Sequence, residues 1–133
     1  MHELKVGIKC EKFINVKKEY LANEIGSGDV PVFSTPMVVN AMESTASELL
    51  KKYLDSDLTS VGTKVSIEHI APTLENVEVK VIAELINIEG RVCKFYVEAC
   101  DNAGIIAKGK HERIILNKEK FINKAQRRSE IVI

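Results

Sequence analysis

Residues 34–54, STPMVVNAMESTASELLKKYL, form the stretch that decides the fold. A hydroxyl residue followed by proline suits a helix N-cap and the first helical position, so we expect a helix that starts at Pro36 with Thr35 as its cap. The apolar residues that follow recur at intervals of three and four, which places them on one stripe of a helix about five turns long. They are Val39, Met42, Ala46, Leu49, Leu50 and Tyr53.

Beyond residue 60 the hydrophobic period changes to two, which is typical of half-buried strands. The predicted strands cover residues 61–69, 77–89, 93–99 and 105–115. Glu89-Gly90 provides a tight reversal, so the second and third of these strands should form an antiparallel hairpin. A short basic helix is expected at residues 117–128.

The segment before the long helix is less regular. We expect a strand around residues 13–16, a helical turn at residues 18–22 and a loop at residues 26–29. One long helix with four or so antiparallel strands predicts an α+β fold, a single domain over residues 1–133 in which the sheet wraps around the helix. Open sheet edges favour dimerisation.

Composition narrows the class of protein. The 133 residues are 45% hydrophobic and 29% charged, with 19 Lys plus Arg against 19 Asp plus Glu. This balance excludes a disordered chain and disfavours a nucleic-acid binder. No apolar run is long enough for a membrane span, and the charged N-terminal residues do not resemble a signal peptide, so we expect a cytoplasmic protein. The spacings of the cysteines and histidines predict neither disulfides nor a metal site.

Two polar residues interrupt the predicted apolar faces. Glu43 lies on the helical stripe, where a carboxylate is paired, protonated or functional, unless it sits solvated at the edge of the stripe. His69 lies on the strand face that should meet the helix, where a lone histidine is more often structural. If the two faces pack together, Glu43 and His69 could form an acid–base pair.

Two further positions have more than one interpretation. Thr35 suits a helix cap, but a hydroxyl beside free backbone N–H groups at a helix N-terminus also suits an acyl oxygen. Gly62 allows either a bend in the strand, which its spacing favours, or the close approach of a ligand.

Three segments carry a family resemblance: VFSTPMVVNAME (residues 32–43), SVGTKVSIEH (residues 60–69) and GKHER (residues 109–113). Their order and separation resemble those of the fluoroacetyl-CoA-specific thioesterase-like group of hotdog-fold proteins, over nearly the whole chain. The resemblance implies a hotdog fold, a homodimer or higher oligomer, and hydrolysis of an acyl-CoA without any cofactor beyond the CoA of the substrate. It also implies site roles for five residues: Thr35, Glu43 and His69 as the catalytic trio, Gly62 lining the acyl site, and Arg113 supporting it.

One departure from the family pattern bears on the substrate. Asp29 stands where the fluoroacetyl-specific enzyme is expected to carry an aromatic gate, which favours another, short-chain acyl-CoA. A non-catalytic acyl-CoA binding module is the alternative function. A hotdog hydratase would need an Asp and a His five residues apart, and no Asp here has that partner.

The neutral total charge conceals a basic C-terminal quarter. Residues 108–128 contain eight Lys and Arg against two Glu, a local charge of plus six. Such a segment suits the phosphates of CoA, although a solvated helix face is the commoner explanation.

Overall fold

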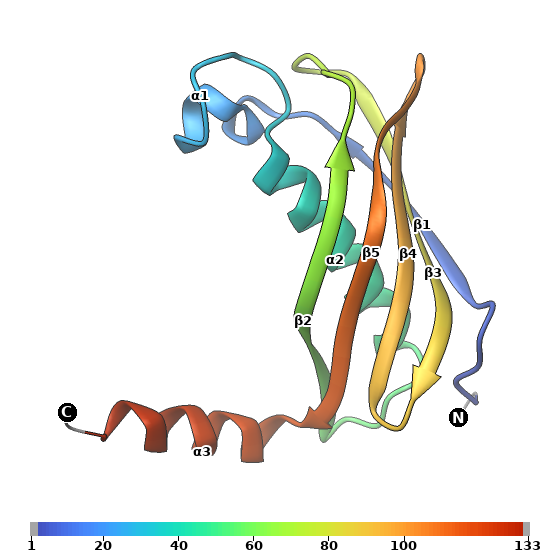
Figure 1. The fold of residues 1–133 in the computed structure, drawn as a ribbon, viewed down its shortest axis with the longest axis vertical. Helices are drawn as coiled ribbons and strands as arrows, with labels where there is room; N and C mark the ends of the chain where they lie inside the picture. The colour runs from blue at the N-terminus through green and yellow to red at the C-terminus, as the bar shows by residue number, and fades with distance from the viewer. Residues whose placement is uncertain (1–2, 132–133) are drawn as a thin grey trace.

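The computed structural model describes residues 3–131. A five-stranded antiparallel sheet curls around one long helix, α2 (Figure 1). The elements in chain order are β1 (Lys9–Asn15), the 3-10 helix η1 (Lys18–Tyr20), α1 (Ala22–Ile25), α2 (Thr35–Lys51), β2 (Leu58–His69), β3 (Glu78–Glu89), β4 (Val92–Asp101), β5 (Gly104–Asn117) and α3 (Lys118–Ser129). The predicted α+β class is confirmed.

The strands follow the order β1-β3-β4-β5-β2, so β1 and β2 are the two edges of the sheet. The β3–β4 hairpin turns at Gly90, whose φ of 61° lies in the left-handed region that glycine adopts readily. β2 pairs with β5 and has a register shift between Gly62 and Lys64. This irregularity confirms the bend that the spacing favoured at Gly62.

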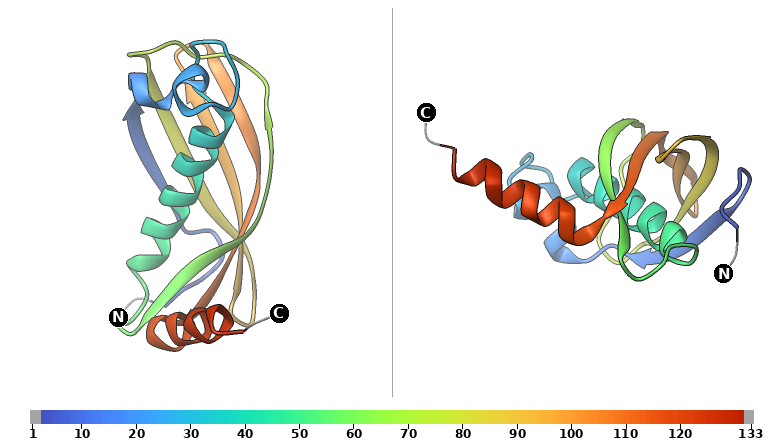
Figure 2. Two further views of the ribbon diagram at one scale, coloured as in Figure 1. Left: turned by 90° about the vertical axis from the view of Figure 1, so that its left-hand side faces the viewer. Right: turned by 90° about the horizontal axis from the view of Figure 1, so that it is seen from below.

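The helix α2 fills the concave side of the sheet and packs against β1, β2, β3 and β4 (Figure 2). Its buried side chains are Val38, Ala41, Met42, Thr45, Ala46, Leu49 and Leu50. The predicted stripe is therefore correct for Met42, Ala46, Leu49 and Leu50 and incomplete elsewhere. Ala41 and Thr45 are also buried, Val38 and not Val39 is fully buried, and Tyr53 lies beyond the helix. Inward-facing residues of β3 and β4 complete the core.

The cap of α2 corrects one prediction. Ser34, not Thr35, is the N-cap: its Oγ accepts a hydrogen bond from the backbone N–H of Met37 at 3.4 Å and donates one to the carbonyl of Tyr20 at 2.7 Å. The helix begins at Thr35, one residue before the predicted start. The Thr35 hydroxyl is exposed and free for another partner.

The N-terminal segment differs from prediction more than the rest. The first strand covers Lys9–Asn15 instead of residues 13–16, and the expected helical turn divides into η1 and α1. Lys12 explains the missed strand. It points from β1 towards α2, where its Nζ donates to Ser44 Oγ at 2.8 Å and meets Glu48 Oε1 at 3.0 Å, so a polar residue interrupts the apolar alternation.

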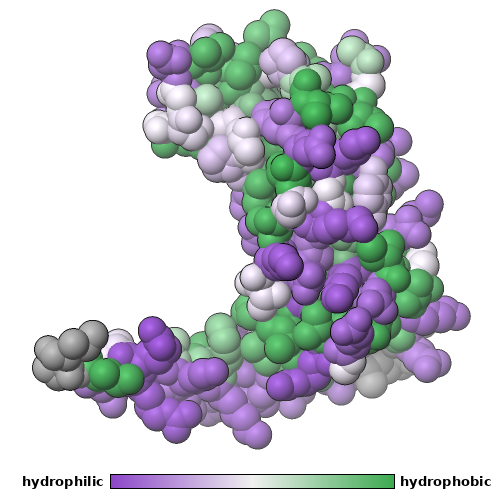
Figure 3. Space-filling view, viewed as in Figure 1, coloured by the Kyte–Doolittle hydropathy of each residue, from purple (hydrophilic) through white to green (hydrophobic). Residues whose placement is uncertain are grey.

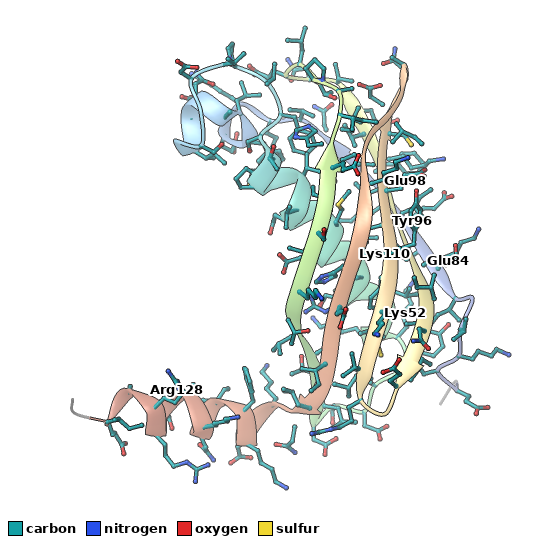
Figure 4. The ribbon with its side chains drawn as sticks, viewed as in Figure 1. Lys52, Glu84, Tyr96, Glu98, Lys110 and Arg128 are labelled. Carbon is teal, nitrogen blue, oxygen red and sulfur yellow. The ribbon has the colours of Figure 1, made fainter. Side chains whose placement is uncertain are left out.

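The outer face of the sheet is polar. Glu84, Tyr96 and Lys110 are register partners across β3, β4 and β5 and lie on the face away from α2 (Figure 4). The Tyr96 hydroxyl donates to Glu98 Oε1 at 2.7 Å, and this bond, together with burial and the charge of Glu98, raises the pKa of Tyr96 to about 12. This face is a solvated, charged surface.

The helix α3 projects from the end of β5 (Figure 1). None of its side chains is buried, and it packs mainly on β5. The molecule is hollowed on the side of β2, between α3 and the α1 region (Figure 3). Among the described residues, no helix combines the length and apolarity that a bilayer crossing requires.

The cap assignment predicts unequal effects of two neighbouring substitutions. Ser34→Ala should lower the free energy of unfolding by about 1–2 kcal/mol, because it removes both the cap and the donor to the Tyr20 carbonyl. Thr35→Val is the matched control and should lower stability by less than Ser34→Ala does, since the Thr35 side chain is exposed and takes no part in the cap. Urea unfolding followed by circular dichroism measures both. A larger loss in Thr35→Val than in Ser34→Ala would contradict the assignment.

Candidate active site

The first residue of α2 meets the last residue of β2. Thr35 Oγ1 lies 2.7 Å from Nδ1 of His69, a hydrogen-bonding distance. Burial lowers the pKa of His69, and the backbone of Ala71 offsets part of this effect. The ring is therefore neutral at pH 7, with one nitrogen able to accept a proton. Its Nε2 is buried and makes no hydrogen bond of standard geometry to the described residues.

A cleft of about 560 Å³ opens beside the Thr35–His69 pair. Among residues 3–131, no charged side chain lines it. The lining residues are Ala22, Ser27, Val32, Phe33, Ser34, Thr35, Pro36, His69, Ile70, Ala71 and Pro72. The predicted hydroxyl and imidazole thus stand at the edge of a largely apolar space.

A second group of polar residues surrounds Glu43, further along α2. Glu43 Oε2 lies 4.0 Å from Nη1 of Arg113, and the two side chains are 42% and 8% exposed. Glu43 therefore sits at the edge of the apolar stripe, half in solvent, beside a buried cation. Burial lowers the pKa of the Arg113 guanidinium, and the charge of Glu43 offsets part of the effect.

Arg113 is held from two strands. Its Nε donates to Ser60 Oγ at 2.9 Å and its Nη2 to the Ser60 carbonyl at 3.0 Å, both on β2. Its Nη1 donates to Nε2 of His111, two residues earlier on β5, at 3.2 Å. These contacts satisfy a charge that would be costly to bury alone.

Gly62 leaves space above this group. A Cβ atom at Gly62 would lie 3.1 Å from Glu43 Oε2, 3.2 Å from His111 Cε1 and 3.4 Å from Arg113 Nη1. Any larger residue would therefore press on the carboxylate or displace it. The resulting opening is a small cleft of about 240 Å³ bordered by Glu43, Gly62, Thr63, Lys64, Val65 and His111.

The structure separates the predicted trio into two groups within one chain. His69 has Thr35 as its partner and Glu43 has Arg113, so the expected Glu43–His69 pair does not form. Thr35 and Glu43 are eight residues apart, which is about 12 Å along a helix. Gly62 and His69 are seven residues apart, about 23 Å along a strand.

Sequence reasoning missed Ser60 and His111. His111 could have been found from the alternation along β5, in which every second residue faces inward. This alternation places two polar side chains, His111 and Arg113, on the inward face. No comparable signal marks Ser60. Among residues 3–131, no group of three or more His, Cys, Asp or Glu side chains is placed to hold a metal ion.

The arrangement provides two sets of chemical groups. One is the Thr35 hydroxyl hydrogen-bonded to the neutral His69 imidazole, which suits proton transfer and the binding of a substrate oxygen atom. The other is a half-exposed carboxylate beside a buried guanidinium, with free space above it, suited to attack on an electrophile or to activation of water.

Comparisons with known proteins identify the family of the chain. The sequence profile of the fluoroacetyl-CoA-specific thioesterase family matches residues 16–119. Fluoroacetyl-CoA thioesterase from Streptantibioticus cattleyicolor is 35% identical over 98 residues, which are 74% of this chain and 70% of that protein.

Solved structures resemble the whole fold. A crystal structure of a variant of the fluoroacetyl-CoA-specific thioesterase FlK with fluoroacetate and CoA has a TM-score of 0.82 and 30% identity, covering 89% of this chain and 99% of that one. A hot-dog-like protein from Thermanaerovibrio acidaminovorans has a TM-score of 0.85 at 21% identity, covering 92% of this chain and 91% of that one. The predicted hotdog fold is thus confirmed, and the chain belongs to the fluoroacetyl-CoA-specific thioesterase family.

Proposed function

We propose that the protein is a thioester hydrolase that cleaves a short-chain acyl-CoA to the free acid and CoA, with Thr35, Glu43 and His69 as its catalytic residues. The observation that carries this proposal is the Glu43 carboxylate, which is half-exposed at a cleft beside the buried Arg113 in a chain of a thioesterase family. A carboxylate in that setting is accessible to substrate and to water, as a nucleophile or a general base must be.

The chemistry requires little acid assistance. A thiolate leaving group has a pKa of about 8.5 in model compounds, so the C–S bond breaks more easily than an amide C–N bond. Glu43 either attacks the carbonyl carbon to form a mixed anhydride with release of the CoA thiolate, and water then hydrolyses the anhydride, or it removes a proton from a water that attacks the carbonyl directly. Thr35 stabilises the acyl oxygen, and His69 passes the proton released by the water to the CoA thiolate.

We propose that the working unit is a homodimer, because one chain does not bring the trio together. β2 is a free edge strand whose two ends carry His69 and the Gly62 region beside Glu43. Antiparallel pairing of two β2 strands places the His69 end of one copy beside the Leu58–Gly62 end of the other. Each site then contains Thr35 and His69 from one copy and Glu43 and Arg113 from the other.

The acyl group should be uncharged. Among the described residues of the chain, none that lines the cleft beside Thr35 and His69 is charged. A carboxylate on the acyl chain would therefore enter this cleft without a partner. Its volume of about 560 Å³ exceeds what an acetyl group fills. These features support a short aliphatic acyl chain as the substrate class.

We propose that the basic residues near α3 receive the phosphates of CoA. A groove of about 870 Å³ shares Gly62 and Thr63 with the Glu43 cleft and extends to α3. Three of its lining residues are cations: Arg91, Lys120 and Lys124. An apolar floor with cations at its far end suits the pantetheine arm and the phosphates of CoA.

A cytoplasmic location is consistent with the thiols. Cys10, Cys93 and Cys100 are free. Burial raises the pKa of the Cys93 and Cys100 thiols, so both stay protonated at neutral pH. Free thiols persist in a reducing compartment, which supports the proposal of a cytoplasmic location.

Release of free CoA thiol from a panel of acyl-CoAs tests the activity. Glu43→Gln and His69→Ala should each lower kcat by about 100-fold or more, the usual contribution of a general base or acid. Glu48→Gln, on the same helix but paired with Lys12, is the matched control and should retain activity. Full activity in Glu43→Gln would overturn the catalytic assignment. If the protein hydrolyses no acyl-CoA but one of them raises its Tm, the non-catalytic binding module becomes the better function.

Complementation tests the shared site. Glu43→Gln and His69→Ala protein are each inactive, but a mixture unfolded and refolded together contains heterodimers with one intact site. If equal amounts of the two variants pair at random, about half of the dimers contain one chain of each variant, and one of the two sites in each such dimer is intact. The mixture should therefore recover about a quarter of the original activity. Sites contained within single chains would recover none.

A further inference from the structure

His111 borders the carboxylate site, and the proposed reaction assigns it no part. Its side chain is buried between β2 and β4, where its ring stacks at 6.2 Å between centroids on Phe95. Its Nδ1 lies 2.8 Å from the backbone carbonyl of Lys64, and its Nε2 lies 3.2 Å from Arg113 Nη1. Both ring nitrogens are therefore engaged.

These two contacts fix the protonation of the ring. A carbonyl only accepts hydrogen bonds, so Nδ1 must carry the proton that reaches Lys64. A guanidinium only donates, so Nε2 must be the bare nitrogen that accepts from Arg113. Burial lowers the pKa of His111 and the charge of Arg113 lowers it further, which keeps this neutral form at pH 7 against the opposing effect of the Lys64 carbonyl.

Contacts with Ser60 and His111 together determine where Arg113 points. Its Nε and Nη2 donate to Ser60 and its Nη1 to His111, and Nη1 is the guanidinium nitrogen that faces Glu43. Nη1 is bonded to His111 and stays 4.0 Å from the carboxylate. A closed Arg–carboxylate pair has N–O distances of about 2.7–2.9 Å. The ion pair at Glu43 is thus open.

We propose that His111 is a positioning residue for the thioesterase: its Nε2 holds Arg113 Nη1 and keeps the Glu43–Arg113 pair open, so that the carboxylate keeps free lone pairs for the carbonyl carbon or for water. This inference rests on the proposed function of Glu43. A closed pair would occupy lone pairs of Oε2 and hold the carboxylate against Arg113, which leaves fewer lone pairs for the reaction.

The groups that face this pair come from four elements. They are Glu43 on α2, Lys64 on β2, His111, Glu112 and Arg113 on β5, and Cys93 on β4, the register partner of Arg113. Burial raises the pKa of the Cys93 thiol, which is therefore neutral. Among the groups around this pair in the described residues, the acceptor nitrogen of His111 is the one that holds Arg113 Nη1 at hydrogen-bonding distance, while Nη1 lies 4.0 Å from Glu43.

Two substitutions separate positioning from packing. His111→Phe keeps a flat ring against Phe95 but removes both nitrogens. His111→Gln supplies an amide that can donate to Lys64 and accept from Arg113. We expect kcat to fall about tenfold or more in His111→Phe with KM changed less than about threefold, the pattern of a lost interaction that acts on the chemical step. His111→Gln should recover most of kcat.

The pH dependence of kcat distinguishes the two roles, because a packing defect alone would not shift the pH at which kcat falls. Without its acceptor, Arg113 Nη1 closes onto Glu43, and a closed pair favours the ionised carboxylate. The acid limb in His111→Phe should therefore move to lower pH even though kcat falls. An unmoved acid limb, or an unchanged kcat, would overturn the proposal.

An experiment on the unsubstituted protein checks the tautomer directly. In ¹⁵N spectra of the histidine rings, His111 should carry its proton on Nδ1 from about pH 7 to pH 8, where a ring with a lowered pKa is neutral. A proton on Nε2 would overturn the proposal, even if His111→Phe failed to fold. Absence of hydrolysis by the unsubstituted protein would instead refute the proposed function, and the two failures are thereby distinguished.

Discussion

The packing of α2 into the concave side of the sheet is the constraint on which the rest of the structure depends. Its seven buried side chains meet strands from both edges and from the centre, and each large one contributes about 1.5–3 kcal/mol when fully buried. This packing fixes the rotation of the helix. It therefore also fixes Thr35 against the end of β2 and Glu43 beside the middle of β5, since both project from the same rigid element.

A buried cation determines the details of the site. Arg113 lies inside the sheet, where an unpaired guanidinium would be strongly destabilising. Ser60 and His111 provide its acceptors, and the irregularity of β2 between Gly62 and Lys64 lies at the level where the Lys64 carbonyl receives the His111 ring. A bulge redirects backbone groups in this way. The bend at Gly62 and the open space above Glu43 thus have one cause, and the two interpretations of that glycine are compatible.

Hydrophobic periods were sufficient to predict the long helix, the hairpin and the α+β class, because each of these elements buries one regular face. The hydrophobic periods failed to predict the local structure where a polar contact, and not the burial of an apolar face, determines it. Ser34 and Thr35 both precede Pro36, and the choice of cap depends on the distant Tyr20 carbonyl. Similarly, Lys12 concealed most of the first strand because its partners lie on α2.

The site residues show the same division. The periodic patterns correctly placed Glu43 and His69 on faces directed towards the core, but a period carries no information on position along the axis. Thr35 and Glu43 lie about 12 Å apart along α2, because each helical residue rises about 1.5 Å. Glu43 therefore does not meet His69, the partner of Thr35, although the patterns had placed Glu43 and His69 together. His111 was visible only as a polar residue on an inward-facing alternation, and its meaning depended on a hydrogen bond to Arg113.

The solvated helix at the C-terminus has an evolutionary consequence. Because α3 buries none of its side chains, most substitutions there cost the fold little, whereas β2 and β5 are restricted by the cation they enclose. If α3 receives the phosphates of CoA as proposed, selection on this helix acts through that contact. Substitutions in α3 would then change the affinity for CoA while the distant Glu43 and His69 stay unaltered.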